Sequence, residues 1–178
     1  MNYIDIVYND TANAPGISTV LFVSGCTNKC PECHNPQSWD FNAGQKFEID
    51  KEGFSIVHSL ASPHVKNFVI SGGDPLIAQN FDDTIALIKF VKDHTHKRII
   101  IYTGLEWYYE EDSRYTQLLD VLDDGDMVID GPYIKELKTE IRDYRGSTNQ
   151  RALMRDSEKL FGFTDISNTY FKSNNWFN

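Results

Sequence analysis

Residues 18–34 read STVLFVSGCTNKCPECH, in which a run of β-branched and aromatic residues leads into the chain's only three cysteines. Cys26, Cys30 and Cys33 follow C-x3-C-x2-C spacing. Three thiolates cannot complete a four-cysteine iron–sulfur site, but they can bind three irons of a 4Fe–4S cluster and leave the fourth iron open. An open iron next to a bound substrate is a reaction site, so this stretch predicts chemistry at a metal cluster.

A zinc site is the alternative interpretation of the same residues. Zinc accepts three sulfurs and one nitrogen, which Cys26, Cys30, Cys33 and His34 would supply. Because His34 directly follows Cys33, closing a tetrahedral site within this one loop would strain it. The spacing therefore favours the cluster, and zinc stays open as the second candidate.

The rest of the chain alternates predicted strands with predicted helices. Residue type predicts strands over residues 3–8, 18–24, 66–71, 98–103 and 127–130. Helices are predicted over residues 50–61, from an N-cap at Asn80 to about residue 93, and over 105–122. This alternation predicts an α/β fold with a mostly parallel sheet and crossover helices.

The length of the chain limits that fold to an incomplete barrel. A full eight-stranded β/α barrel takes about 250 residues, whereas this chain has 178. We therefore expect a partial β/α barrel that forms a single domain over residues 1–178, with a C-terminal tail at about 167–178 that either packs as an extension or stays loose. The loops that follow parallel strands would meet at one rim, where such folds bind ligands.

Composition narrows the range of partners. The formal net charge is −9 and the isoelectric point is near 4.9, which argues against nucleic-acid binding. An odd number of closely spaced cysteines argues against disulfides and fits the reducing cytoplasm. The N-terminal segment lacks a signal-peptide pattern, and no apolar run is long enough to span a bilayer, so we expect no membrane association.

A second motif, Ser71-Gly72-Gly73-Asp74-Pro75-Leu76, follows a predicted strand. Two adjacent glycines let the backbone approach a ligand closely, and unpaired backbone groups can bind an ammonium or a carboxylate. An ordinary turn between a strand and a helix is the plainer explanation of the motif when it is taken alone.

The cysteine loop resembles the signature of the radical S-adenosylmethionine superfamily. The resemblance implies that S-adenosylmethionine binds the open iron and that one electron from the cluster breaks its S–C5′ bond. The motif at 71–76 resembles the superfamily's Gly-Gly-Glu motif, which implies that Gly72, Gly73 and Asp74 bind the methionine amino group. Glu32 departs from the pattern, because an aromatic residue commonly precedes the third cysteine. Contacts with the adenosine are then implied for the backbone of Glu32 and His34 and for Tyr102, Thr103 and Gly104.

Four longer stretches resemble a narrower family, the activating proteins of anaerobic ribonucleotide reductases. They are CHNPQSW at 33–39, IIIYTG at 99–104, VIDGPY at 128–133 and RGSTNQR at 145–151. The resemblance implies a glycyl radical made on the large catalytic subunit of the reductase, with electrons from a low-potential donor such as flavodoxin. It also implies that Asp130, Arg145, Asn149 and Arg151 position the substrate or the partner, although these residues equally suit a polar loop whose side chains bond the backbone.

Two other functions remain open at the level of sequence. One is a radical S-adenosylmethionine enzyme that acts on a small molecule or activates a different glycyl-radical enzyme. The other is a metal-binding or electron-transfer protein without enzymatic activity. The RGSTNQR stretch favours the reductase activator over the first, and cleavage of S-adenosylmethionine would exclude the second.

Overall fold

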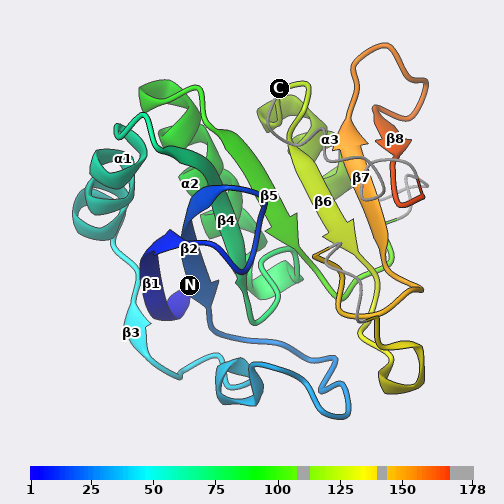
Figure 1. The fold of residues 1–178 in the computed structure, drawn as a ribbon. Coiled ribbons are helices and arrows are strands. Elements are labelled where there is room, and N and C mark those ends of the chain that lie inside the picture. The colour runs from blue at the N-terminus through cyan, green and yellow to red at the C-terminus, as the bar shows by residue number, and fades with distance from the viewer. Residues whose placement is uncertain (108–112, 140–143, 169–178) are drawn as a thin grey trace.

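The computed structural model describes residues 1–107, 113–139 and 144–168. Over these ranges the chain forms an eight-stranded mixed sheet in the order β3-β1-β2-β4-β5-β6-β7-β8 (Figure 1). The strands are β1 (Asn2–Asp10), β2 (Ile17–Val23), β3 (Gln45–Lys46), β4 (Val65–Gly72), β5 (Arg98–Tyr102), β6 (Met127–Asp130), β7 (Arg151–Arg155) and β8 (Phe163–Asp165). The α/β class predicted from the sequence is confirmed.

The prediction of a mostly parallel sheet is wrong. Strands β2, β4, β5 and β6 form a parallel centre, while β1 pairs antiparallel with β2 and β3, and β7 pairs antiparallel with β6 and β8. A parallel pair needs a crossover connection, whereas a chain that turns back directly pairs antiparallel. The sequence pattern gave no sign of β3, β7 or β8, which supply three of these antiparallel pairings.

The sheet is open. Strands β3 and β8 stand at its two ends and do not pair with each other (Figure 1). The prediction of a partial barrel is therefore not confirmed, and the parallel centre with antiparallel flanks describes the architecture better.

The helices differ from the predicted ones mainly at their ends. They are α1 (Phe54–Leu60), α2 (Ala78–His94) and α3 (Ser113–Val121), with a π-helical turn η2 (Ile49–Gly53) before α1 and short 3₁₀ turns η1 (Pro36–Ser38) and η3 (Lys135–Leu137). The N-cap prediction at Asn80 is wrong, because α2 starts at Ala78 and Asn80 is buried inside its first turn.

Within the helix predicted over residues 105–122, the described residues are helical only in α3. Residues 108–112 lie outside the ranges that the structure describes. After β5 the chain instead bonds to the end of β6. The Gly131 amide donates to the Leu105 carbonyl at 2.8 Å, and the Trp107 amide donates to Asp130 at 2.8 Å. The predicted C-terminal tail also falls largely outside the described residues, because 169–178 are not among them.

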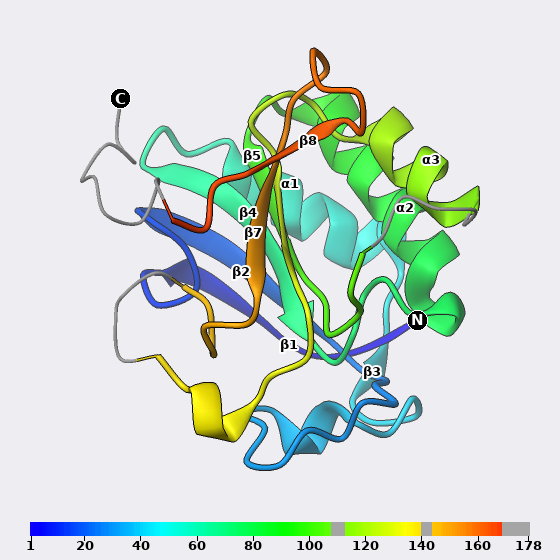
Figure 2. The same ribbon diagram turned by 90° about the vertical axis from the view of Figure 1, so that its right-hand side faces the viewer.

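Alternating residues of the central strands form two apolar layers, as the period-2 geometry of a strand requires. Leu21, Phe68, Ile70, Ile99 and Ile101 belong to the larger cluster, which also contains the apolar faces of α1, α2 and α3. Figure 2 shows α2 and α3 together on one side of the sheet. Neighbouring residues form the second cluster on the other side: Val20, Val69, Ile100, Met127 and Ile129. The helices therefore cover one face and leave loops to shape the other.

Among the residues that the structure describes, no helix combines the length and the apolar character needed to cross a membrane.

Candidate metal-cluster site

The loops after the four parallel strands contribute to the wall of an open cavity of about 690 Å³. This agrees with the expectation that the cysteine loop and the glycine-bearing strand ends share one rim. Of the predicted site residues, the following line the cavity: Cys26, Cys30, Cys33, His34, Gly72, Gly73, Tyr102, Thr103, Gly104 and Arg145. The other five do not line it: Glu32, Asp74, Asp130, Asn149 and Arg151.

The three cysteines are unpaired thiols, each partly exposed. Burial raises the pKa of the Cys26 thiol above its ordinary value, and nearby backbone hydrogen bonds lower it by less. The Cys33 sulfur accepts a hydrogen bond from the Asn35 amide at 3.4 Å. Three free thiols on one short loop and one cavity wall are a donor set that fits an iron–sulfur cluster.

No group of three or more His, Cys, Asp or Glu side chains is gathered as a single-ion site within residues 1–107, 113–139 and 144–168. The three thiols nevertheless line one common cavity. A cluster takes one thiolate at each of three irons, so its ligands stand further apart than the ligands of one ion. The fit to a cluster therefore rests on the shared cavity wall and on the thiol chemistry.

The cysteine loop is joined to the Gly72-Gly73 loop through the backbone. The Gly73 amide donates to the Val23 carbonyl at 2.7 Å, and the Asp74 amide donates to the Gly25 carbonyl at 2.8 Å. A Cβ atom on Gly73 would lie only 2.5 Å from the Gly25 oxygen. Gly72 has φ of +99°, a conformation that glycine adopts without strain. The glycine pair is thus needed for packing between the loops, whatever it binds.

Asp74 is buried beneath the cavity wall and is 1% exposed. Its carboxylate accepts hydrogen bonds from the Thr103 hydroxyl at 2.8 Å, the Leu76 amide at 3.1 Å and the Gly104 amide at 3.1 Å. Burial raises the pKa of Asp74, while these hydrogen bonds act in the opposite direction. The side chain therefore ties the loop after β4 to the loop after β5.

The two residues that flank the third cysteine differ in placement. His34 lines the cavity, with its ring 5.8 Å from the ring of Tyr133. Glu32 has φ of +57° and forms an ion pair with Lys135 of η3 outside the cavity lining. The side chain of Glu32 thus links the cysteine loop to the segment after β6.

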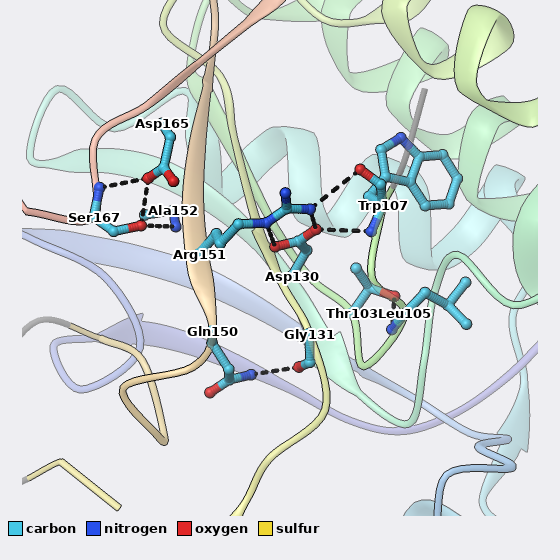
Figure 3. A network of polar contacts seen from close by, with 10 residues as sticks. All are labelled: Thr103, Leu105, Trp107, Asp130, Gly131, Gln150, Arg151, Ala152, Asp165 and Ser167. Atoms are coloured by element: carbon cyan, nitrogen blue, oxygen red, sulfur yellow. Dashed lines mark hydrogen bonds and ion pairs between the residues drawn. The ribbon is translucent and has the colours of Figure 1, made fainter. Parts of the chain in front are cut away.

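Two of the predicted positioning residues form an ion pair with each other, between a half-buried arginine and a buried aspartate (Figure 3). Asp130, 1% exposed at the end of β6, accepts from Arg151 Nε at 3.0 Å and from the Trp107 amide at 2.8 Å. Arg151 also donates to the Trp107 carbonyl at 3.3 Å. The pair therefore holds β6, β7 and the segment after β5 together.

The other residues of the RGSTNQR stretch bond to the protein backbone, line the cavity, or do both. Asn149 donates to the Pro132 carbonyl at 2.8 Å, and Gln150 donates to the Gly131 carbonyl at 2.9 Å (Figure 3 shows the latter). Arg145 donates to the Gln150 carbonyl at 3.0 Å and lines the cavity. Backbone bonding by this loop, the plainer of the two sequence interpretations, is thus present.

Several cavity residues were not among the predicted site residues. Thr11, Ala12 and Asn13, in the turn between β1 and β2, reach the same cavity, and the Tyr102 hydroxyl donates to the Asn13 carbonyl at 2.8 Å. The others are Asn28, Asn35, Trp39, Ser71, Gly131, Tyr133, Tyr144, Gly146 and Gln150. The β1–β2 turn lies at the opposite end of β2 from the cysteine loop. Only tertiary folding brings this turn to the cavity, so no local pattern could have identified it.

The fold and the three-cysteine cavity agree with an iron–sulfur domain, and residues 12–153 match the family described as a 4Fe-4S single cluster domain. Proteins named anaerobic ribonucleoside-triphosphate reductase-activating protein are also similar. Those of Escherichia coli K12 and Haemophilus influenzae are each 35% identical over 153 residues, 84% of this chain and 96% of theirs. That of Enterobacteria phage T4 is 37% identical over 152 residues, 85% of this chain and 92% of its own. The chain belongs to the family of anaerobic ribonucleoside-triphosphate reductase-activating proteins.

Proposed function

We propose that this chain is a radical S-adenosylmethionine activase that generates a glycyl radical on the large subunit of an anaerobic ribonucleotide reductase. The observation that carries the proposal is the shared cavity of Cys26, Cys30 and Cys33 with the Gly72-Gly73 loop, in a chain of this family. The RGSTNQR stretch adds support, because it borders the same cavity through Arg145.

Cys26, Cys30 and Cys33 would hold a 4Fe–4S cluster, and S-adenosylmethionine would bind beside it. When bound, the two supply one-electron cleavage of a carbon–sulfur bond and the ability to abstract a hydrogen atom. The protein contributes binding, orientation and exclusion of water from the site.

The walls of the cavity divide these tasks. The backbone of Gly72 and Gly73 faces the cavity and suits the methionine end of the cofactor, while Tyr102, Thr103 and Gly104 suit its adenosine. Asp74 holds these two loops together from beneath rather than from within the cavity. Arg145 and the backbone of His34 stand on further parts of the wall and suit the incoming peptide and the adenosine, respectively.

The proposed reaction needs an external electron and a reducing compartment. A low-potential donor such as flavodoxin would reduce the cluster. Free thiols persist as metal ligands in the cytoplasm, where we place the protein.

The test is anaerobic reconstitution with iron and sulfide, followed by reduction in the presence of S-adenosylmethionine and the reductase large subunit. We expect 5′-deoxyadenosine and an electron paramagnetic resonance signal from a glycyl radical on the large subunit. Cys30→Ala should abolish both, whereas Thr27→Ala, an exposed change in the same loop, should retain both.

Three results would count against the proposal. Cleavage of S-adenosylmethionine without a radical on the reductase would point to another substrate. Stoichiometric zinc with no iron after anaerobic purification would point to a metal-binding role. Retained cleavage by Cys30→Ala would contradict the ligand assignment.

A further inference from the structure

We infer that Asn80 is a positioning residue that fixes the cysteine loop and the Gly72–Asp74 loop in one mutual geometry. The inference rests on the proposed function for its consequence, because the first loop would carry the cluster and the second would bind S-adenosylmethionine. Its structural part stands on contacts in the protein itself.

The side-chain amide of Asn80 reaches both loops. Its nitrogen donates to the Ser24 carbonyl at 2.8 Å and to the Asp74 carbonyl at 3.0 Å, and lies 3.4 Å from the Gly25 carbonyl. Ser24 and Gly25 immediately precede Cys26, and Asp74 immediately follows Gly73. One amide group therefore connects the residues next to the proposed cluster ligand with the residues next to the proposed cofactor-binding glycines.

Burial makes these bonds costly to lose. Asn80 is 2% exposed, so a backbone carbonyl that loses its donor here gains no water in exchange. The residue sits in the first turn of α2, which packs through Phe81, Ile85 and Ile88 onto the sheet. The amide is thus fixed to the rigid core, and it transfers that rigidity to two loops of the rim.

A carboxylate is the sharpest substitution at this position. Asn80→Asp keeps the size of the side chain but replaces its only donor group with an acceptor. Oxygen atoms would then face the carbonyl oxygens of Ser24 and Asp74. The three cysteines stay in place, so the change separates loop geometry from metal ligation.

Asn67 offers a matched control. It is also 2% exposed, and its amide donates to the Pro15 carbonyl at 2.7 Å and the Ser18 hydroxyl at 3.1 Å. It lies near the start of β4, whereas the Gly72–Asp74 loop follows the strand's other end. Asn67→Asp therefore introduces the same substitution at a buried residue whose bonds reach neither the cysteine loop nor the Gly72–Asp74 loop.

Hydrogen exchange of the metal-free protein is the first experiment. The quantity compared is the exchange rate of the Gly73 and Asp74 amides divided by the exchange rate of the β5 amides. We expect this ratio to be at least about tenfold higher in Asn80→Asp than in the wild type. In Asn67→Asp the ratio should match that of the wild type. Equal ratios in the two variants would overturn the inference. Should Asn80→Asp not fold, Asn80→Ala is compared with Asn67→Ala under the same criterion.

The second experiment uses the reconstituted protein. Iron content of Asn80→Asp should equal that of the wild type, while the KM for S-adenosylmethionine should rise about tenfold and the cofactor-induced change in the cluster's electron paramagnetic resonance spectrum should weaken. An unchanged KM and spectrum would refute the positioning role. If the wild type itself cleaves no S-adenosylmethionine, the proposed function fails, while the exchange comparison still decides whether Asn80 holds the loops.

Discussion

At Gly73 the backbone of one loop of the site touches the backbone of the other. The Gly25 oxygen leaves no room for a side chain, since a Cβ would approach it to 2.5 Å. Backbone atoms cannot rotate aside as a long side chain can, so a substitution must move a loop. The sequence motif assigned this glycine to ligand binding, and the structure adds a steric reason for it.

We predict that Gly73→Ala lowers the free energy of unfolding by about 1–3 kcal/mol through overpacking and reduces the iron bound after reconstitution. The reason is that the displaced loop carries Cys26. Gly125→Ala is the control, because Gly125 has φ of +92° with no atom within 4 Å of an added Cβ. Backbone strain should cost that variant about 1–2 kcal/mol and leave iron binding intact. Equal iron content in the two variants, measured beside urea unfolding, would contradict the steric argument.

At this scale, the sequence revealed residues whose chemistry is local. Three cysteines within eight residues identify themselves by spacing. Asp74 and Asn80 do not, because their roles depend on burial and on partners in other loops: Thr103 and Gly104 for the first, Ser24 for the second. A pattern read along the chain placed one as a ligand and the other as a helix cap.

Among the elements, β6, β7 and the segment after β5 depend on the Asp130–Arg151 pair. We predict that Arg151→Ala lowers the free energy of unfolding by roughly 2–4 kcal/mol, because it leaves a buried carboxylate unpaired. The estimate is below the full value for a buried pair because the Arg151 side chain is 35% exposed. Urea unfolding measures the change.

The double variant Asp130→Asn, Arg151→Ala should recover part of that loss, since the unpaired charge is gone. Lys135→Ala serves as the comparison, because it breaks the exposed ion pair with Glu32 and should barely change stability. A double variant no more stable than Arg151→Ala would mean that the arginine acts through packing rather than through charge.

A second junction between elements predicts a pH dependence. Asp126, just before β6, accepts from the Ile99 amide of β5 at 2.7 Å and pairs with Lys92 of α2 at 2.7 Å. Burial raises the pKa of Asp126, and the charge of Lys92 only partly offsets this. The native state therefore holds the proton at higher pH than the unfolded state does, so this contribution to stability falls as pH rises from the ordinary value, about 3.9, through the raised one.

We therefore expect the stability deficit of Asp126→Asn, relative to wild type, to shrink as pH rises through that window. Asp124→Asn should show the opposite sign. Hydrogen bonds from Ser157 lower the pKa of Asp124, so its contribution is lost as pH falls through the lowered value and the deficit grows with rising pH. Urea titrations at several pH values between acid and neutral measure both slopes. Parallel slopes would contradict the assignment.

Elements were predictable where one residue pattern dominated. Strand β6 begins and ends where the sequence indicated, because Met127–Asp130 is a short apolar run closed by Gly131-Pro132. The helix predicted over 105–122 failed at its start because Leu105 and Trp107 bond to the end of β6 instead. Strand β7 was missed because its pairing with β6 follows from a long return loop, which no local pattern reveals.

Across the whole molecule, the cavity and the main core occupy different places. The loops at one rim supply the thiols, while Leu21, Phe68, Ile70 and Ile101 pack with the helices away from the cavity lining. The central strands are fixed by that packing, and the rim then needs only short loops to bring the proposed ligands together. The alternation of strands and helices, restricted by the length of the chain, predicted a partial barrel, yet an open sheet with antiparallel flanks achieves the same convergence of loops.

This separation predicts that the metal-free fold does not need its cysteines. We expect Cys26→Ala, Cys30→Ala and Cys33→Ala combined to keep the thermal midpoint of the metal-free protein within about 3 °C of wild type, with unchanged far-ultraviolet circular dichroism and no cluster after reconstitution. Ile101→Ala, a change at a residue with 0% exposure, should instead cost about 2–5 kcal/mol. A triple variant that unfolds as readily as Ile101→Ala would mean that the cysteine loop supports the core, because the rim and the core would then form one cooperative unit.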